Sequence, residues 1–347
     1  MTKVNKISVM LIAALAAASI LSCTKEEKVV TGANAIGFHC TDVWTKAMVS
    51  TSEDLQGDGF QVYAHGTFEG SGKTYTFSRH VTHSLDGWNY TDTEYWLPTC
   101  GYTFRAYFPA SLESLISEVS PTEYKIQGYE IASQYGKQQD ILMAEAARTT
   151  AQALGGDGTT VPLTFRHLLS NLNVTLKVKQ VKREETVLDD DGNPVVDENG
   201  NPVTEMKWVN AIDADVKAVA FTGVAQKADY NGAWTNHTGY ASVGDNMQSP
   251  ERVTPEGVMI FGKDGLLAIP ETLEDGDVSL YILADITLPN GTRMQKDWTL
   301  RVPAATWAPN NKYNYTATLT EDFNIEFEEP KVESWSQEQM SGTVIIR

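Results

Sequence analysis

Short segments that alternate apolar and polar residues run along the chain from about residue 34, and Gly, Asp, Asn and Pro separate them. An alternation of period two predicts strands with one buried face. Helical periodicity is scarce: residues 111–119 predict one or two turns, and residues 165–169 predict about one more. Many short strands without intervening helices predict an all-β sandwich or barrel. The clearest predicted strands are Phe60–Ala64, Thr74–Phe77, Tyr102–Phe108, Leu172–Val178, Val278–Ala284 and Tyr313–Leu319.

The first residues have the pattern of an export signal. Lys3 and Lys6 precede an apolar, Ala-rich run over residues 9–20. Because this run is too short to span a bilayer and ends in small residues, it predicts a secretory signal peptide over residues 1–22.

Cys23 stands directly after this segment, as in a lipobox. Cleavage between Ser22 and Cys23, with a diacylglycerol on the Cys23 sulfur, would hold the chain at the outer membrane through its acyl chains. An ordinary signal peptide followed by a coincidental Cys is the alternative. The charged residues 24–28 resemble signals that send lipoproteins to the cell surface, or form a solvated tether.

The chain is acidic, with 45 Asp and Glu against 27 Lys and Arg and a net charge of −18. Removal of residues 1–22 deletes two lysines and no acid, so the mature chain carries −20. Binding to duplex nucleic acid needs a cationic face, and the sequence has no run of Lys or Arg that would form one. We therefore expect no nucleic-acid partner. With 347 residues, the chain is long enough for about two domains.

Two cysteines besides Cys23 are present, Cys40 and Cys100. In an oxidising envelope they either form a disulfide or remain free, and their separation in sequence does not decide between the two.

Two similar turns, residues 191–196 and 199–204, each contain Gly-Asn-Pro and predict a protruding hairpin between Val181 and Trp208. The acidic residues there also suggest a calcium loop. However, an EF-hand frame would place Val187 at the first ligand position, and no helices flank it. A solvated hairpin without a metal is the favoured interpretation.

The sequence suggests no catalytic site and no cofactor. His80 and His83 lack the glutamate and further ligand of a zinc hydrolase helix. Residues 66–74 approach a phosphate-binding loop, but the spacing is one residue too long and the context is a β-turn. No Gly-x-Ser-x-Gly elbow occurs. We therefore expect a protein that is not an enzyme.

A series of segments, in their order along nearly the whole mature chain, resembles the fimbrillin family, the Mfa-like subunits of type V pili. The segments are Ile36-Gly37-Phe38, Trp44-Thr45-Lys46-Ala47, Phe60–Ala64, Trp88-Asn89-Tyr90, Tyr95-Trp96-Leu97-Pro98, Tyr102–Pro109, Asp140–Ala144, Val161–Ser170, Ile325–Phe327, Val332–Trp335 and Gly342–Ile346.

The resemblance implies two tandem transthyretin-like β-sandwich domains after a lipoprotein signal peptide. The corresponding division of the chain is a signal peptide (1–22), a lipidated tether (23–33), an N-terminal domain (34–158), a C-terminal domain (159–320) and a candidate donor segment (321–347).

It also implies a structural or adhesive pilus subunit that polymerises with other fimbrial subunits. A protease removes the first strand, and another subunit's C-terminal segment fills the groove. By position, the cut would fall between Lys46 and Ala47, where the family more often has arginine. An ordinary loop lysine is the alternative.

The candidate donor residues are Val344, Ile345 and Ile346, with a permanent edge strand of the chain's own domain as the alternative. A Cys40–Cys100 disulfide would retain the first strand, so it conflicts with this mechanism.

Two other functions remain open at this stage. In the first, the chain is a surface lipoprotein that keeps its first strand and serves as a pilus anchor or accessory subunit. Alternatively, it binds a host or bacterial surface receptor or glycan, with Trp234 and Tyr240 stacking on sugars if they are exposed and not part of the core.

Overall fold

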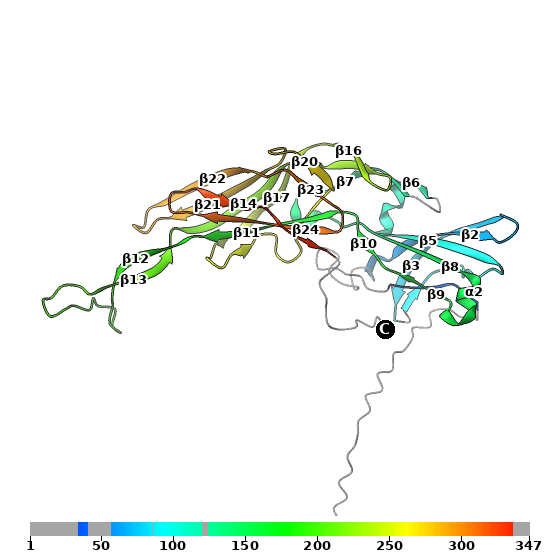
Figure 1. Cartoon of the computed structure of the whole chain (residues 1–347), viewed down its shortest axis with the longest axis horizontal. Helices are drawn as coiled ribbons and strands as arrows, with labels where there is room; N and C mark the ends of the chain where they lie inside the picture. The colour runs from blue at the N-terminus through cyan, green and yellow to red at the C-terminus, as the bar shows by residue number, and fades with distance from the viewer. Residues whose placement is uncertain (1–33, 41–56, 86, 120–123, 336–347) are drawn as a thin grey trace, which may run out of the picture.

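A computed structural model describes residues 34–40, 57–85, 87–119 and 124–335. The predicted lipidation site Cys23, the cleavage positions Ser22, Lys46 and Ala47, and the donor residues Val344, Ile345 and Ile346 lie outside these ranges. Strands dominate the described chain, which confirms the predicted all-β class (Figure 1). Within these ranges, no helix has the length and hydropathy needed to cross a bilayer.

The first half of the chain forms a sheet in the order β10-β8-β5-β2-β3-β4. A short parallel ribbon of β1 and β9 lies beside it and shares its aromatic core, which includes Phe60, Trp88 and Phe104. The strands are β1 (Gly37–Cys40), β2 (Phe60–Phe68), β3 (Thr74–Ser84), β4 (Gly87–Asn89), β5 (Cys100–Phe108), β8 (Leu142–Thr149), β9 (Thr160–Leu163) and β10 (Arg166–His167).

The second half forms a sandwich. One sheet has the order β18-β11-β24-β25, with β19 added to β11 and β26 added to β24, and the other has the order β17-β14-β21-β22. Both contribute to one core, in which Phe221 of β14 packs on Tyr315 of β24. The strands are β11 (Ser170–Val178), β14 (Asp213–Val224), β17 (Ala241–Arg252), β18 (Val258–Met259), β19 (Leu266–Ala268), β21 (Ser279–Thr287), β22 (Arg293–Arg301), β24 (Asn311–Leu319), β25 (Ile325–Phe327) and β26 (Lys331–Ser334).

A third sheet, in the order β16-β15-β7-β6, draws on both halves of the chain. It covers a core that contains Tyr107, Trp234 and Trp335. Its strands are β6 (Ile116–Val119), β7 (Tyr124–Glu130), β15 (Lys227–Tyr230) and β16 (Trp234–Thr238). Since β7 precedes the predicted boundary at residue 158 and its neighbour β15 follows it, a continuous sheet joins the two sides. The division into two domains stays a prediction.

The remaining described elements are two two-stranded antiparallel pairs, of which β12 with β13 is a hairpin, and four short helical segments. They are β12 (Gln180–Thr186) with β13 (Thr204–Asn210), β20 (Glu271–Leu273) with β23 (Ala305–Trp307), η1 (Ala110–Leu115), η2 (Tyr135–Lys137), α2 (Thr150–Gln152) and η3 (Ala153–Asp157).

All six strands that the sequence predicted most clearly are present. The turn predicted in residues 111–119 is η1, which gives way to β6 after Leu115. The helical turn predicted in residues 165–169 is wrong. Arg166 and His167 instead form β10, because their backbone pairs with Met143 and Leu142 of β8.

Candidate functional site

The segment that contains β1 (residues 34–40) has a neighbour on each side. On one side it pairs in parallel with β9, with Phe38 opposite Val161 and Cys40 opposite Leu163. On the other side the residues just before β1 bridge to the chain near Tyr95. The backbone of the first described segment therefore lies between two neighbours that are distant in sequence.

Hydrogen bonds at the start of this segment fix its position. The amide of Ile36 donates to the Glu94 carbonyl over 2.9 Å, and the amide of Trp96 donates to the Asn34 carbonyl over 2.8 Å. The Tyr90 hydroxyl donates to the carbonyl of Ile36 over 2.6 Å. These contacts come from the aromatic segment between β4 and β5 and place β1 over the core.

The side chains of Ile36, Phe38 and Cys40 are buried in the core, and His39 is the one residue of β1 that is less buried. The Phe38 ring lies 5.6 Å from that of Tyr90 and 5.7 Å from that of Phe104, between centroids. Burial of a large apolar side chain contributes about 1.5–3 kcal/mol. Removal of this strand would therefore expose an apolar trough and the unpaired backbone edge of β9.

His39 is the polar member of β1. It is half-buried, and burial lowers its pKa below the usual value, with the positive charge of Arg148 lowering it further. The Arg148 guanidinium in turn donates to the carbonyl of Thr160 in β9 over 2.7 Å. The imidazole is consequently neutral when the strand is seated at neutral pH.

Cys40 and Cys100 are both buried and both free, so no disulfide joins them in the structure. Burial raises the pKa of each thiol, by a large amount for Cys40. The sequence had left pairing open. Apart from its continuity with the chain, β1 is therefore held by packing and hydrogen bonds.

The predicted donor segment begins with residues that belong to the chain's own sheet. Strands β25 and β26 both pair antiparallel with β24, and the amide of Trp335 donates to the Asn310 carbonyl over 2.8 Å. Up to Trp335, this segment therefore forms part of the resident sandwich.

Trp335 is clamped by a contact that the sequence did not reveal. Its indole stacks on the imidazole of His167, and His167 Nδ1 pairs with Asp140 Oδ2. All three side chains are buried. Each belongs to a different segment of the family pattern, so the pattern marks the three partners but not their contact.

The residues considered as candidates for catalysis do not come together in one site. His80 and His83 are three apart on β3 and therefore lie on opposite faces. The His83 ring packs against Trp88, and the segment with the phosphate-loop spacing is the β2–β3 connection, not a strand-to-helix turn. Among the described residues, no group of three or more His, Cys, Asp or Glu is placed to hold a metal ion.

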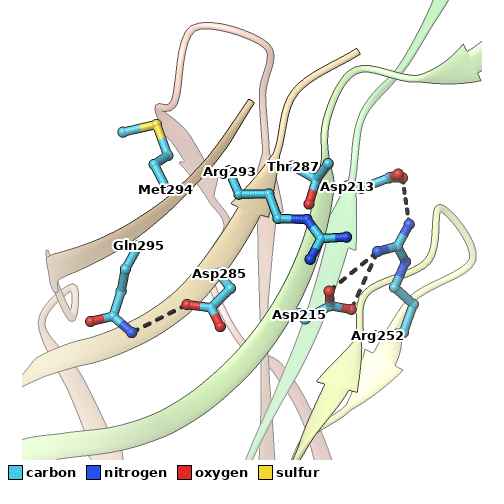
Figure 2. Close-up of a pocket in the computed structure, with 8 residues that line it drawn as sticks. All are labelled: Asp213, Asp215, Arg252, Asp285, Thr287, Arg293, Met294 and Gln295. Atoms are coloured by element: carbon cyan, nitrogen blue, oxygen red, sulfur yellow. Dashed lines mark hydrogen bonds and ion pairs between the residues drawn. The ribbon is translucent and has the colours of Figure 1, made fainter. Parts of the chain in front are cut away.

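A polar hollow of about 640 Å³ opens on the sheet of β14, β17, β21 and β22 (Figure 2). Arg252 joins Asp213 at 2.7 Å and Asp215 at 3.3 Å, and Gln295 donates to Asp285 over 3.2 Å. The charges of Arg252, Asp213 and Asp215 compensate one another, and the lining places no His or Lys beside the Thr287 hydroxyl that could activate it.

The two aromatic residues expected to contact sugars differ in exposure. Trp234 is buried and donates to the Leu168 carbonyl over 2.8 Å, so its predicted role on the surface is wrong. Tyr240 is 58% exposed and borders a hollow of about 320 Å³ that is also lined by Glu271 and Asp277.

The hairpin predicted between Val181 and Trp208 is present as β12 and β13. The carboxylates of Asp189 and Asp197 accept backbone hydrogen bonds within their own turns, from Asn193 and Asn201 among others. These hydrogen bonds lower the pKa of both carboxyl groups. The two acidic side chains thus build the turns.

A family model described as fimbrillin-like matches residues 45–335. The chain belongs to the fimbrillin-like family. A fimbrial protein from Bacteroides vulgatus has a similar structure, with a TM-score of 0.62 and 17% identity over 87% of this chain and 99% of that chain. A candidate cell adhesion protein from Bacteroides uniformis gives a TM-score of 0.46 and 16% identity over 87% of this chain and 97% of that chain. A search of the curated proteins found no match.

Membership of the fimbrillin-like family gives the chain a fimbrial or adhesion-related role at the cell surface, with other fimbrial subunits as its partners. The family is one of structural and adhesive proteins and not one known for enzymes. In this fimbrillin-like chain, the position that β1 occupies beside β9, with residues 90–96 contacting the segment just before it, is the candidate site for subunit assembly. We call this position the seat of β1.

Proposed function

We propose that this fimbrillin-like chain is exported as a lipoprotein and becomes a pilus subunit by exchanging its first strand. The observation that supports this most is the seat of β1. It is a short ribbon at the start of the fold whose apolar side chains are buried, yet no disulfide between Cys40 and Cys100 ties it to the core.

The exchange would proceed by cleavage between Lys46 and Ala47, which separates β1 from the rest of the chain. The trough then accepts the C-terminal segment of a second subunit as an added strand. Residues 336–347 follow the Trp335 clamp, and in extended form they would span up to about 40 Å. This length exceeds that of β1 with its flanking residues, and either Ile345 or the pair Val344 and Ile346 would supply apolar side chains for the core.

Limited trypsin digestion of the mature protein tests the proposal. We expect a cut after Lys46, followed by ladders of oligomers that resist sodium dodecyl sulfate. Lys46→Gln should remain uncut at this position and monomeric. Sequencing the N-terminus of the cell-surface form completes the test, because a processed subunit begins at Ala47 and an unprocessed lipoprotein at Cys23.

The donor residues have their own matched pair of variants. Alternate residues of a strand point to opposite faces, so Ile345→Asp and the double variant Val344→Asp/Ile346→Asp place charge on different faces. One variant should be cut but form no ladder, while the other assembles. If cleaved wild-type protein stays monomeric, the chain is a non-polymerising anchor or accessory subunit.

A second candidate function rests on the Tyr240 hollow. An exposed aromatic ring beside the carboxylates of Glu271 and Asp277 is suited to stacking on a sugar and accepting hydrogen bonds from its hydroxyls. Glycan-array binding that is lost in Tyr240→Ala and kept in Tyr95→Ala, another exposed tyrosine, would support it. An array without a specific signal contradicts it.

A further inference from the structure

The hairpin of β12 and β13 projects from the body of the molecule, at the left in Figure 1. Five of the large apolar side chains that are exposed in the described chain lie on this hairpin or its tip: Leu188, Val195, Val196, Met206 and Trp208. Such clustering on one projecting element marks an interaction surface.

The strand register divides the hairpin into two faces. On one face Lys182 is paired with Trp208, and the next layer pairs Glu184 with Met206. Trp208 is 62% exposed and Met206 is 61% exposed. The Lys182 ammonium lies 5.2 Å from the centroid of the Trp208 ring, and the Thr204 hydroxyl donates to Glu184 over 2.5 Å. We call this the 182–208 face.

The 182–208 face has four layers whose order matters. From the base of the hairpin to its tip they are Gln180 with Asn210, Lys182 with Trp208, Glu184 with Met206, and Thr186 with Thr204. A cation and an aromatic ring therefore lie directly beside an anion and a thioether, at the centre of the face.

We propose that the 182–208 face docks on the same face of a second copy of this chain. A two-fold axis that crosses the strands between the second and third layers places β12 over β12 and β13 over β13, with the strands reversed. Lys182 then meets Glu184 of the second copy, and Trp208 meets its Met206. The amides of the first layer meet the hydroxyls of the fourth.

Both central contacts are favourable. Lys182 and Glu184 pair opposite charges twice per dimer, and a methionine sulfur packs well against an aromatic ring. A two-fold axis along the strands would instead place β12 over β13, with Lys182 over Trp208 of the second copy and Glu184 over its Met206, so that neither charge would meet an opposite charge. The charge pattern therefore selects the antiparallel dimer and fixes its register.

The contact is small. Strand dimensions give it roughly 250 Å² on each copy, well below the approximately 800 Å² per partner of a stable complex. The association is consequently weak between free molecules and strong only where many copies are held together, as along adjacent fibres or on one membrane. It does not depend on strand exchange, because it uses neither the β1 seat nor the C-terminal segment.

Sedimentation equilibrium of the mature chain, up to about 1 mM protein in 150 mM salt, tests the proposal directly. Wild-type protein should show a weak monomer–dimer equilibrium. Lys182→Glu sets two pairs of like charges against each other and should weaken the dimer at least fivefold. The double variant Lys182→Glu/Glu184→Lys restores complementarity and should recover most of the wild-type association.

Lys207→Glu is the matched control. Lys207 is exposed on the opposite face of the same hairpin, so the substitution changes the net charge equally and should leave the association unaltered. A monomeric wild-type protein at the highest concentration overturns the proposal. Equal weakening by Lys182→Glu and Lys207→Glu, or no recovery in the double variant, overturns it as well.

Discussion

The indole ring of Trp335 lies flat on the imidazole ring of His167, with the ring centroids 3.5 Å apart and the planes within 1° of each other. His167 in turn pairs with the buried carboxylate of Asp140, which also accepts a hydrogen bond from the amide of Ile141 over 2.8 Å. The contact joins the end of the described chain to the segment around β8 and β10.

We expect Trp335→Ala to lower the free energy of unfolding by about 3–5 kcal/mol, because truncation of a fully buried tryptophan leaves a cavity and loses its packing. Urea denaturation followed by circular dichroism measures the change. Val332→Ala is the control, since Val332 is 53% exposed on the preceding strand and should alter stability little. Equal effects of the two variants would contradict a clamp at Trp335.

His167→Leu should cost about 3–5 kcal/mol, because it leaves the Asp140 carboxylate buried without its partner. Asp140→Asn removes that charge, so the double variant should lose clearly less than the sum of the two single variants. A double-mutant cycle from denaturation curves gives the coupling energy. Strict additivity would mean that the pair is not coupled.

Phe38→Ala should lower the free energy of unfolding by about 3–5 kcal/mol, since it empties the space between Tyr90 and Phe104. The weaker seat of β1 should also speed cleavage after Lys46 by trypsin. Trp208→Ala, an equally drastic truncation of an exposed ring, serves as the control and should stay within about 0.5 kcal/mol of wild type. Unchanged stability and cleavage in Phe38→Ala would contradict the role given to this strand.

Stability should fall as the pH drops below about 6.5, partly through His39. Its folded-state pKa lies below the usual value because of burial and the nearby Arg148. The unfolded chain therefore binds the proton first as the pH falls, and stability that is complete above about pH 7 is lost towards the folded pKa. Thermal melts between pH 7.5 and 5.5 should show a smaller decrease for His39→Gln than for wild type; an identical slope would contradict it.

The thiols of Cys40 and Cys100 should resist a thiol reagent in the native protein and react fully in urea. Burial keeps both groups protonated and inaccessible, and the thiolate is the reactive form. Mass spectrometry at pH 8 gives the number of labelled cysteines per chain and so distinguishes protected from reactive thiols. Rapid labelling of either Cys under native conditions would show that its site opens readily.

Much of the fold was predictable from the sequence because alternation of apolar and polar residues is local information. Every second residue of Tyr313–Leu319 is buried, and the even-numbered residues of Tyr102–Phe108 likewise enter one core, so the period of two is visible without any partner. The prediction of a helical turn over residues 165–169 failed for the opposite reason. They contain clustered apolar residues and no alternation, and only pairing with β8 makes Arg166 and His167 a strand.

The candidate site was predictable in part. The order of the family segments pointed to β1 as a functional strand, and the alternation of Ile36 and Phe38 agrees with its burial. The sequence offered no way to separate a buried tryptophan such as Trp234 from an exposed one such as Trp208. Their environments depend on which strands lie over them, and that is decided by contacts between distant segments.

The clamp on Trp335 also has a mechanical consequence. If a neighbouring subunit holds the C-terminal tail, as proposed above, tension on the tail would enter the described fold at residue 335. The force then acts first on a large ring wedged beside His167, and only afterwards on the hydrogen-bond ladder between β26 and β24. The packed indole would therefore resist the pulling force before β26 is stripped from β24.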